Sequence, residues 1–313
     1  MSFRPKGVGA GMNAAADLWL GSQTIWRPRA AGYLAICAIF RDEAEWLPEW
    51  IEYHRVLGVE RFFLYNNRST DAARRVLQPY CRNGTVELFD LSFPDPFNRW
   101  QIKAINHALE RSRGRFHWLA SLDVDEFLVP KHADSLPEYL QKLESHPAVI
   151  VNWQIFGTSI VTDLPAGTCS VEVLTRKALP DYEENRLGKA IVQPDKVRRL
   201  KVHEPVLYDG LTAVNADGQP YRAGEIAIEQ AQINHYWWRT ESWFWRHKVP
   251  RREAYEKLTG GRVIPETEWR QRMTICNAIE DLAIQRFVPK LKQALNISVE
   301  RPGARKVVTP YCA

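Results

Sequence analysis

Apolar runs separated by polar turns divide the first half of the chain into a regular alternation. Four runs have the length and density of buried strands: 33–40, 61–65, 85–89 and 118–122. Three segments between them carry apolar residues at helical spacing: 46–57, 71–80 and 101–112. The alternation predicts an α/β fold with a mostly parallel sheet and helices on both faces.

The second half is less regular. Residues 135–145 predict a helix, 148–153 a strand, and 163–230 a mixture of short strand-like pieces and polar loops. An aromatic block follows at 233–248. Beyond it, apolar positions from Trp269 to Phe287 predict one long helix over 266–296.

The strand at 118–122 ends in three carboxylates, Asp123, Asp125 and Glu126. Ligands of an open α/β sheet bind outside the carboxyl ends of its strands. Adjacent acids repel one another unless a cation neutralises them, so the pattern is typical of a divalent-cation site that holds a diphosphate. The alternative is a polar turn that caps a buried strand. The chain has no Gly-x-Gly-x-x-Gly or Walker A loop, and a bound phosphate would need the metal or basic side chains.

Composition narrows the class of protein. With 313 residues, 45% of them hydrophobic, the chain can bury the core of one large domain with an appendage. The net charge of +5, from 42 basic and 37 acidic residues, is too small and diffuse to favour nucleic acid. The five cysteines are scattered without a CxxC pair, which indicates a reduced, cytoplasmic protein without a zinc site. No apolar run approaches the ~20 residues that span a bilayer.

Segments on both sides of the acids carry a family resemblance. We call Asp123–Phe127, with the sequence DVDEF, the acidic motif. The matching segments are Arg41-Asp42-Glu43-Ala44, Asn67-x-Ser69-Thr70-Asp71, Gln101, Trp153-x-x-Phe156-Gly157, His203, His235-Tyr236 and Lys248. Their order and spacing over 34–248 resemble the family 2 and family 92-like glycosyltransferases. The resemblance implies a GT-A fold, a nucleotide-sugar donor (a UDP-sugar is expected), Mn²⁺ or Mg²⁺, and inversion at the anomeric carbon.

The same resemblance implies a domain organisation. Residues 1–30 are expected to form a loosely ordered lead-in, and 31–262 the GT-A catalytic domain. Within that domain, 31–130 would be the nucleotide-binding half and 131–262 the acceptor half. Residues 263–313 would form a C-terminal helix and tail.

Site residues are also carried over from the family. The resemblance implies Asp125 as the first metal ligand, Asp123 at the ribose or at the metal, and His235 as a third ligand from the far side of the donor. Nucleotide and phosphate contacts are expected from Arg41, Glu43, Asn67, Asp71, Lys103 and Lys189. Asn67 and Asp71 have an alternative interpretation as turn and helix-cap residues. Lys103 and Lys189 could instead be solvated surface residues, and His235 a structural residue among the tryptophans. His54 lies on the apolar face of its helix, which favours a buried, hydrogen-bonded role.

An inverting transfer needs a general base for the acceptor hydroxyl. The acidic candidates are Asp163, Glu183, Glu184 and Glu204, and we take Glu204 as the candidate to test. The acceptor is expected to be a glycan or a lipid-linked glycan. Arg251 and Arg252 are then candidates for peripheral contact with the inner membrane surface. The tryptophans from Trp237 to Trp245 either stack on sugars or, in most cases, pack in the core.

Two other functions fit parts of the pattern. A sugar-phosphate nucleotidyltransferase would use the same acids, but such enzymes carry an N-terminal glycine-rich loop that residues 39–43 lack. A non-catalytic carbohydrate-binding protein needs no acid cluster at a strand end. The leading hypothesis is therefore a metal-dependent glycosyltransferase of polysaccharide or glycoconjugate assembly.

Overall fold

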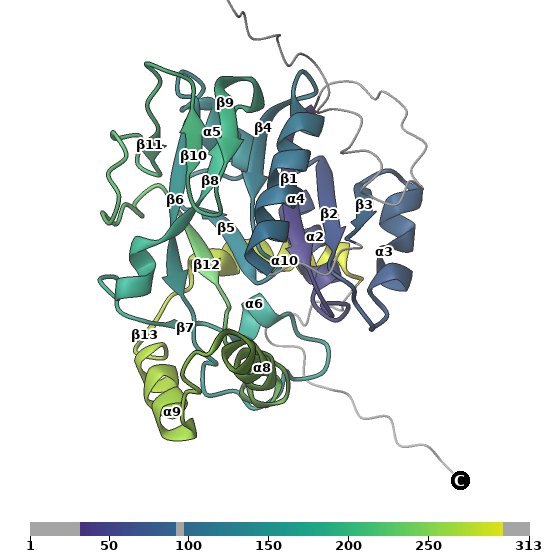
Figure 1. The fold of residues 1–313 in the computed structure, drawn as a ribbon, viewed down its shortest axis with the longest axis vertical. Helices are drawn as coiled ribbons and strands as arrows, with labels where there is room; N and C mark the ends of the chain where they lie inside the picture. The colour runs from purple at the N-terminus through teal and green to yellow at the C-terminus, as the bar shows by residue number, and fades with distance from the viewer. Residues whose placement is uncertain (1–31, 92–96, 297–313) are drawn as a thin grey trace, which may run out of the picture.

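A computed structural model describes residues 32–91 and 97–296. The predicted lead-in at 1–30 and the end of the predicted tail lie outside these residues. A large sheet forms the centre of the molecule, with strand order β3-β2-β1-β4-β8-β6-β12-β5 and β11 attached to β6 (Figure 1). Its strands are β1 Gly32–Phe40, β2 Arg61–Asn66, β3 Val86–Asp90, β4 Phe116–Ser121, β5 Glu126–Pro130, β6 Ala148–Ile155, β8 Gly188–Val192, β11 Val214–Asn215 and β12 Ala231–His235.

The first half is parallel, as predicted. β1 pairs in parallel with both β2 and β4, and β2 pairs in parallel with β3. The connecting helices are α2 Leu47–Val56, α3 Ala73–Arg82 and α4 Phe97–Ser112. The predicted α/β fold with helices on both faces is therefore confirmed.

Alternate residues of β1 enter two different cores. Leu34, Ile36 and Ala38 pack with α2 residues such as Trp50 on one face. Ala35 and Cys37 pack on the other face, together with α4 residues. Successive side chains of a strand point to opposite faces, so one continuously apolar strand serves both cores.

The second half of the sheet is mixed, and it curls. β8 is antiparallel to both β4 and β6, β12 is parallel to β6, and β5 is antiparallel to β12. Only residues 122–125 connect β4 to β5, although three strands lie between these two in the sheet order. A chain covers at most about 3.6 Å per residue, and 124–125 form a turn. The edge strand β5 must therefore come round beside the end of β4, and the acidic motif closes this gap.

Shorter elements cover the carboxyl end of the sheet and its sides. They are α5 Leu136–Gln141, α6 Ser170–Val173, β7 Arg176–Lys177, η1 Glu183–Arg186, η2 Pro194–Lys196, β9 Val197–Leu200, β10 Pro205–Leu207, α7 Glu241–Trp243, the π-helix η3 Phe244–Lys248 and α8 Val249–Thr259. In the aromatic block, Trp238, Trp243 and Phe244 are buried in the core, so packing is the role of these rings.

The long helix predicted over 266–296 is wrong. The chain instead forms α9 Glu266–Ile275, β13 Ile279–Glu280, η4 Ala283–Phe287 and α10 Val288–Ala294. Tertiary contacts interrupt the helical period: β13 pairs with β7, and the Asn277 side chain accepts the Ser159 N–H at 2.7 Å. Pro289 stands at the start of α10, where a missing N–H costs nothing. No helix among the described residues is long and apolar enough to cross a membrane.

Candidate active site

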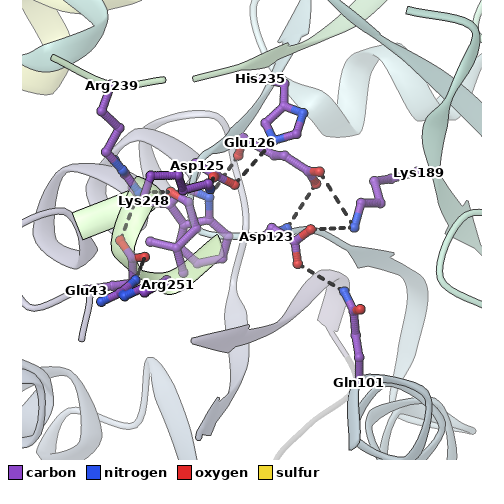
Figure 2. A network of polar contacts seen from close by, with 12 residues as sticks. Glu43, Gln101, Asp123, Asp125, Glu126, Lys189, His235, Arg239, Lys248 and Arg251 are labelled. Atoms are coloured by element: carbon purple, nitrogen blue, oxygen red, sulfur yellow. Dashed lines mark hydrogen bonds and ion pairs between the residues drawn. The ribbon is translucent and has the colours of Figure 1, made fainter. Parts of the chain in front are cut away.

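The acidic motif forms a tight, fully anchored turn after β4. The Asp123 N–H donates to Glu126 Oε2 at 2.9 Å, and the Glu126 N–H donates to the Asp123 carbonyl at 3.0 Å. From α2, the Trp50 indole N–H donates to the Glu126 carbonyl at 2.8 Å. These bonds hold the three carboxylates in fixed and different directions (Figure 2).

Asp123 faces Lys189 of β8. Lys189 Nζ lies 2.7 Å from Asp123 Oδ2 and 3.6 Å from Glu126 Oε1. Gln101 of α4 donates to the other oxygen of Asp123 at 3.2 Å. Burial acts to lower the pKa of Lys189, but Asp123 and Glu126 outweigh it and raise that pKa, so the lysine is charged.

Glu126 points into the protein rather than toward a ligand. Its side chain is 0% exposed, and burial raises its pKa well above the ordinary value against the opposing effect of Lys189. One lysine and two carboxylates are electrically balanced when one carboxylate is protonated. The raised pKa favours the protonated form of Glu126, and its side chain supports the turn through the Asp123 N–H.

Asp125 faces the opposite side of the turn. Its Oδ1 lies 3.5 Å from His235 Nε2, and its Oδ2 lies 3.3 Å from Lys248 Nζ. Burial acts to raise the pKa of Asp125, but Lys248 first and then His235 hold it well below the ordinary value. Lys248 belongs to η3, a π-helical segment, and such segments re-aim side chains at functional sites.

Two arginines, Arg239 and Arg251, lie on the same side of the acidic motif as Asp125 and pair with Glu43. Arg239 is 2% exposed, its Nη2 lies 3.0 Å from Glu43 Oε2, and its guanidinium lies 4.1 Å from the Trp46 ring centroid. Its φ of +51° places a non-glycine residue in the left-handed region, a strain that proteins keep mainly at functional sites. Arg251 of α8 lies 3.8 Å from Glu43 Oε1. Figure 2 shows these side chains converging on Glu43 and Asp125 from one side.

The donor atoms at Asp125 fit a divalent cation. A carboxylate oxygen and an imidazole nitrogen 3.5 Å apart suit Mn²⁺, and metals at diphosphate sites often take only one or two protein carboxylates. The described residues contain no group of three or more His, Cys, Asp or Glu that could hold a metal on its own, so the donor's phosphates would complete the sphere. Asp123 is engaged with Lys189 and Gln101, and its part in metal binding stays a prediction.

The predicted nucleotide-binding residues divide into two groups. Glu43 and Lys189 belong to the cluster around the acidic motif. Arg41, Asn67 and Asp71 lie in the loops that follow β1 and β2. There, Asp71 accepts the Ala44 N–H at 2.8 Å and the Ala73 N–H at 3.0 Å, which joins the two loops.

Arg41, Asn67 and Lys103 were also predicted to contact the nucleotide. Arg41 is 57% exposed and pairs with Asp42 at 3.6 Å, and the Asn67 side chain is half-buried. Lys103 is exposed on α4, with its Nζ 4.7 Å from the Trp100 ring centroid. Contact of these residues with a nucleotide stays a prediction.

The candidate bases lie outside the cluster. Glu204 accepts the Tyr221 hydroxyl at 2.9 Å, and Asp163 pairs with Arg246 at 3.2 Å. Glu183 and Glu184 lie on η1. Among the described residues, no hydrogen bond or ion pair joins any of these four carboxylates to the acidic motif.

Sequence reasoning listed Lys248 as a family match without a role at the acidic motif, and it took Arg251 as a candidate membrane contact. The sequence shows a run of basic residues at the end of the aromatic block. Which of these side chains points toward Asp125 depends on the π-helical geometry of η3. The prediction for His54 is confirmed. Its Nδ1–H donates to the Trp50 carbonyl at 2.8 Å, its Nε2 accepts the Leu128 N–H at 3.4 Å, and burial lowers its pKa to about 3.

Solved structures with a partial likeness include a mannosyltransferase and the protein TarS. A mannosyltransferase from Pyrobaculum calidifontis, in complex with GDP-Man and Mn²⁺, aligns with a TM-score of 0.37 and 13% identity over 90% of this chain and 80% of that chain. TarS from S. aureus, in complex with UDP-GlcNAc, aligns with a TM-score of 0.35 and 11% identity over 62% of this chain and 60% of that chain.

Sequence relatives are more informative. A glycosyltransferase family 92 protein of Oryza sativa subsp. japonica is 30% identical over 220 residues, which cover 67% of this chain and 34% of the relative. A galactan beta-1,4-galactosyltransferase of Arabidopsis thaliana is 26% identical over 190 residues, which cover 58% of this chain and 36% of the relative. The chain spans about a third of the length of the curated relatives it matches. The model of glycosyltransferase family 92 matches residues 33–273, most of the described fold, and the chain belongs to that family.

Proposed function

We propose that this protein transfers a sugar from a nucleotide diphosphate to a glycan acceptor, with a divalent cation held at Asp125 and His235. Family membership supports the reaction class. It also favours this function over the nucleotidyltransferase and the non-catalytic binder that the sequence left open.

One observation carries the proposal: Asp125 lies between a metal-ligand imidazole and a lysine, at the carboxyl end of a central strand. His235 Nε2 is 3.5 Å from one of its oxygens and Lys248 Nζ is 3.3 Å from the other. A strand cap needs neither partner. A diphosphate site needs both a cation ligand and a fixed positive charge next to it.

The side chains have separate tasks in the transfer. Negative charge grows on the diphosphate as the bond to the sugar breaks, and a bound divalent cation supplies Lewis-acid stabilisation there. Lys248, with Arg251 and Arg239 nearby, would offer fixed positive charge to the diphosphate. Asp123 is held by Lys189 at one oxygen and by Gln101 at the other, and because its side chain is a third exposed, its remaining lone pairs would accept a ribose hydroxyl.

Inversion, the general base and the donor are finer proposals. The relatives named galactan beta-1,4-galactosyltransferases make a galactosyl donor the first to test. A cytoplasmic location and membrane contact remain proposals too. Arg251 and Arg252 pair with Glu43 and Glu256 in the structure, so a membrane would have to compete with these ion pairs.

A nucleotide-sugar screen tests the proposal. UDP-sugars and GDP-sugars would be added with and without Mn²⁺, and the melting temperature recorded, because a ligand that binds only the folded state raises it. We expect a metal-dependent rise that Asp125→Asn removes, together with loss of transfer activity. Asp134→Asn, at an exposed site distant from the motif, is the matched control. Full turnover in Asp125→Asn would refute the proposal.

A further inference from the structure

A row of three aromatic rings leads away from the proposed diphosphate site. The His235 and Trp153 ring centroids are 4.5 Å apart, and the Trp153 and His203 centroids are 5.2 Å apart. Lys189 Nζ lies 5.9 Å from the Trp153 centroid. Trp153 therefore lies beside both Lys189, the partner of Asp123, and His235, the partner of Asp125. The His203 ring packs against Trp153 in turn. Neither ring has a role in the function proposed above.

The His203 ring is held in one tautomer. Its Nδ1 lies 2.9 Å from the Gly188 carbonyl, which can only accept, so Nδ1 carries the hydrogen. Burial, aided by the charge of Lys189, lowers the pKa of His203 despite that hydrogen bond, and the ring is neutral at pH 7. Nε2 then presents a lone pair, to which no described residue donates a hydrogen bond.

Gly188 is required for this arrangement. A Cβ at Gly188 would lie 2.2 Å from the Val151 carbonyl oxygen, so only glycine allows β8 to approach β6 this closely. The same close approach fixes the Gly188 carbonyl under the imidazole. The ring of His203 is thus positioned by backbone rather than by a mobile side chain.

Trp153 contributes an unsatisfied donor. Its side chain is buried, with 9% exposed, and its Nε1–H has no hydrogen-bond partner among the described residues. Buried N–H groups without a partner are costly, and at functional sites a ligand can supply the partner. An aromatic ring with one donor and one neighbouring acceptor matches a pyranose, which has an apolar C–H face and hydroxyls around its edge.

We propose that Trp153 and His203 form the subsite for the sugar that is transferred, and that His203 Nε2 accepts a hydrogen bond from one of its hydroxyls. The inference rests on the proposed function. A sugar linked to a diphosphate at Asp125 and His235 must extend outward from there, and Trp153 is the ring packed on His235. An acceptor in a fixed direction distinguishes hydroxyl epimers, so His203 would select the donor sugar. Its low basicity suits this task and makes it a poor general base.

The test separates sugar recognition from nucleotide recognition. With Mn²⁺ present, calorimetry would measure the affinity of the full chain for UDP and for UDP-galactose, UDP-glucose and UDP-N-acetylglucosamine; where the screen above selects guanine, GDP and GDP-mannose would replace them. The variants are His203→Ala, Trp153→Phe, which removes the N–H together with one ring of the indole, and the control His132→Ala at an exposed site. Thermal melting checks that each variant is folded.

We expect His203→Ala and Trp153→Phe each to weaken the affinity for the preferred nucleotide sugar about tenfold, which corresponds to the loss of one hydrogen bond. The affinity for UDP or GDP alone should stay within about twofold of that of the unaltered chain. Preference between epimeric sugars should fall in His203→Ala. Folded variants that bind both ligands normally, or lose both equally, would overturn the subsite. If the unaltered chain binds UDP or GDP but no nucleotide sugar, the proposed function fails as well. The titrations with UDP or GDP alone identify that case.

Discussion

Lys189 Nζ lies 2.7 Å from Asp123 Oδ2, while the lysine side chain is only 1% exposed. A buried ammonium is tolerated only when its charge is balanced, and here Asp123 balances it at the end of β4. The first acid of the motif is therefore part of the fold as well as part of the site.

Removal of this lysine should destabilise the protein. Lys189→Met leaves Asp123 and the buried Glu126 without their cation, and we expect a loss of about 2–4 kcal/mol, below the full cost of breaking a buried pair because Asp123 is a third exposed. Urea unfolding measures it. The double variant Lys189→Met with Asp123→Asn, which also removes the unbalanced carboxylate, should recover part of the loss, and Lys103→Met should change stability by less than about 0.5 kcal/mol. A Lys189→Met protein as stable as the original would contradict the buried pair.

Mn²⁺ affinity should depend more on the Asp125–His235 side of the acidic motif than on Asp123. Because His235 and Asp125 offer the converging donor atoms, His235→Ala should weaken Mn²⁺ binding in the presence of UDP at least about tenfold. Asp123→Asn should weaken it by less, since Asp123 faces Lys189. Electron paramagnetic resonance of free Mn²⁺ gives both affinities. The reverse order would place the metal at Asp123.

Acid stability should depend on Lys248. Burial acts to raise the pKa of Asp125, and Lys248 is the main group that lowers it. A carboxylate with a lowered pKa stabilises the fold above the ordinary value, and this contribution is lost as pH falls through the folded pKa. Lys248→Met should raise the Asp125 pKa toward the unfolded value, so that the variant is less stable at pH 7 and loses less stability on acidification. Melting temperatures between pH 3 and pH 7 test this, with Lys257→Met, which alters an exposed lysine of α8, as the control. Identical acid profiles would show that Lys248 does not act on Asp125.

The C-terminal segment should be part of the same folding unit. Asp281 accepts from Lys177 Nζ at 2.6 Å and from Gln232 Nε2 at 3.0 Å, which ties β13 to the buried side of the sheet. Asp281→Ala leaves an almost buried lysine unpaired, and we expect about 3–5 kcal/mol of lost stability. Glu280→Ala, at the exposed neighbour, is the control. Two separate unfolding transitions, only one of them shifted in Asp281→Ala, would show that the segment is an independent appendage.

Much of the first half could be predicted because its signals are local. The strands β1 to β4 are apolar runs, the helices between them have a clear period, and Asp123 and Asp125 follow a strand directly. The role of His54 followed from its position on an apolar helix face. In each case the sequence pattern that predicts the role of a residue lies within a few positions of that residue.

The partners of the motif could not be predicted in the same way. Lys189 and Lys248 meet Asp123 and Asp125 across 66 and 123 residues of sequence. Their positions depend on the antiparallel insertion of β8 and on the π-helical turn of η3, neither of which has a periodic signature. The failure at 266–296 has a similar cause, because pairing of β13 with β7 outweighed a helical pattern that was locally sound.

β6 pairs with β8 through residues 148–152 and with β12 through residues 153–155. A single strand is thus shared by the sheet region that carries Lys189 and the one that carries His235. Rotation of the sheet region that carries Lys189 against the region that carries His235 would have to break this strand between Asn152 and Trp153. The separation of Lys189 from His235, and with it the spacing of the two sides of the acidic motif, is therefore set when the chain folds.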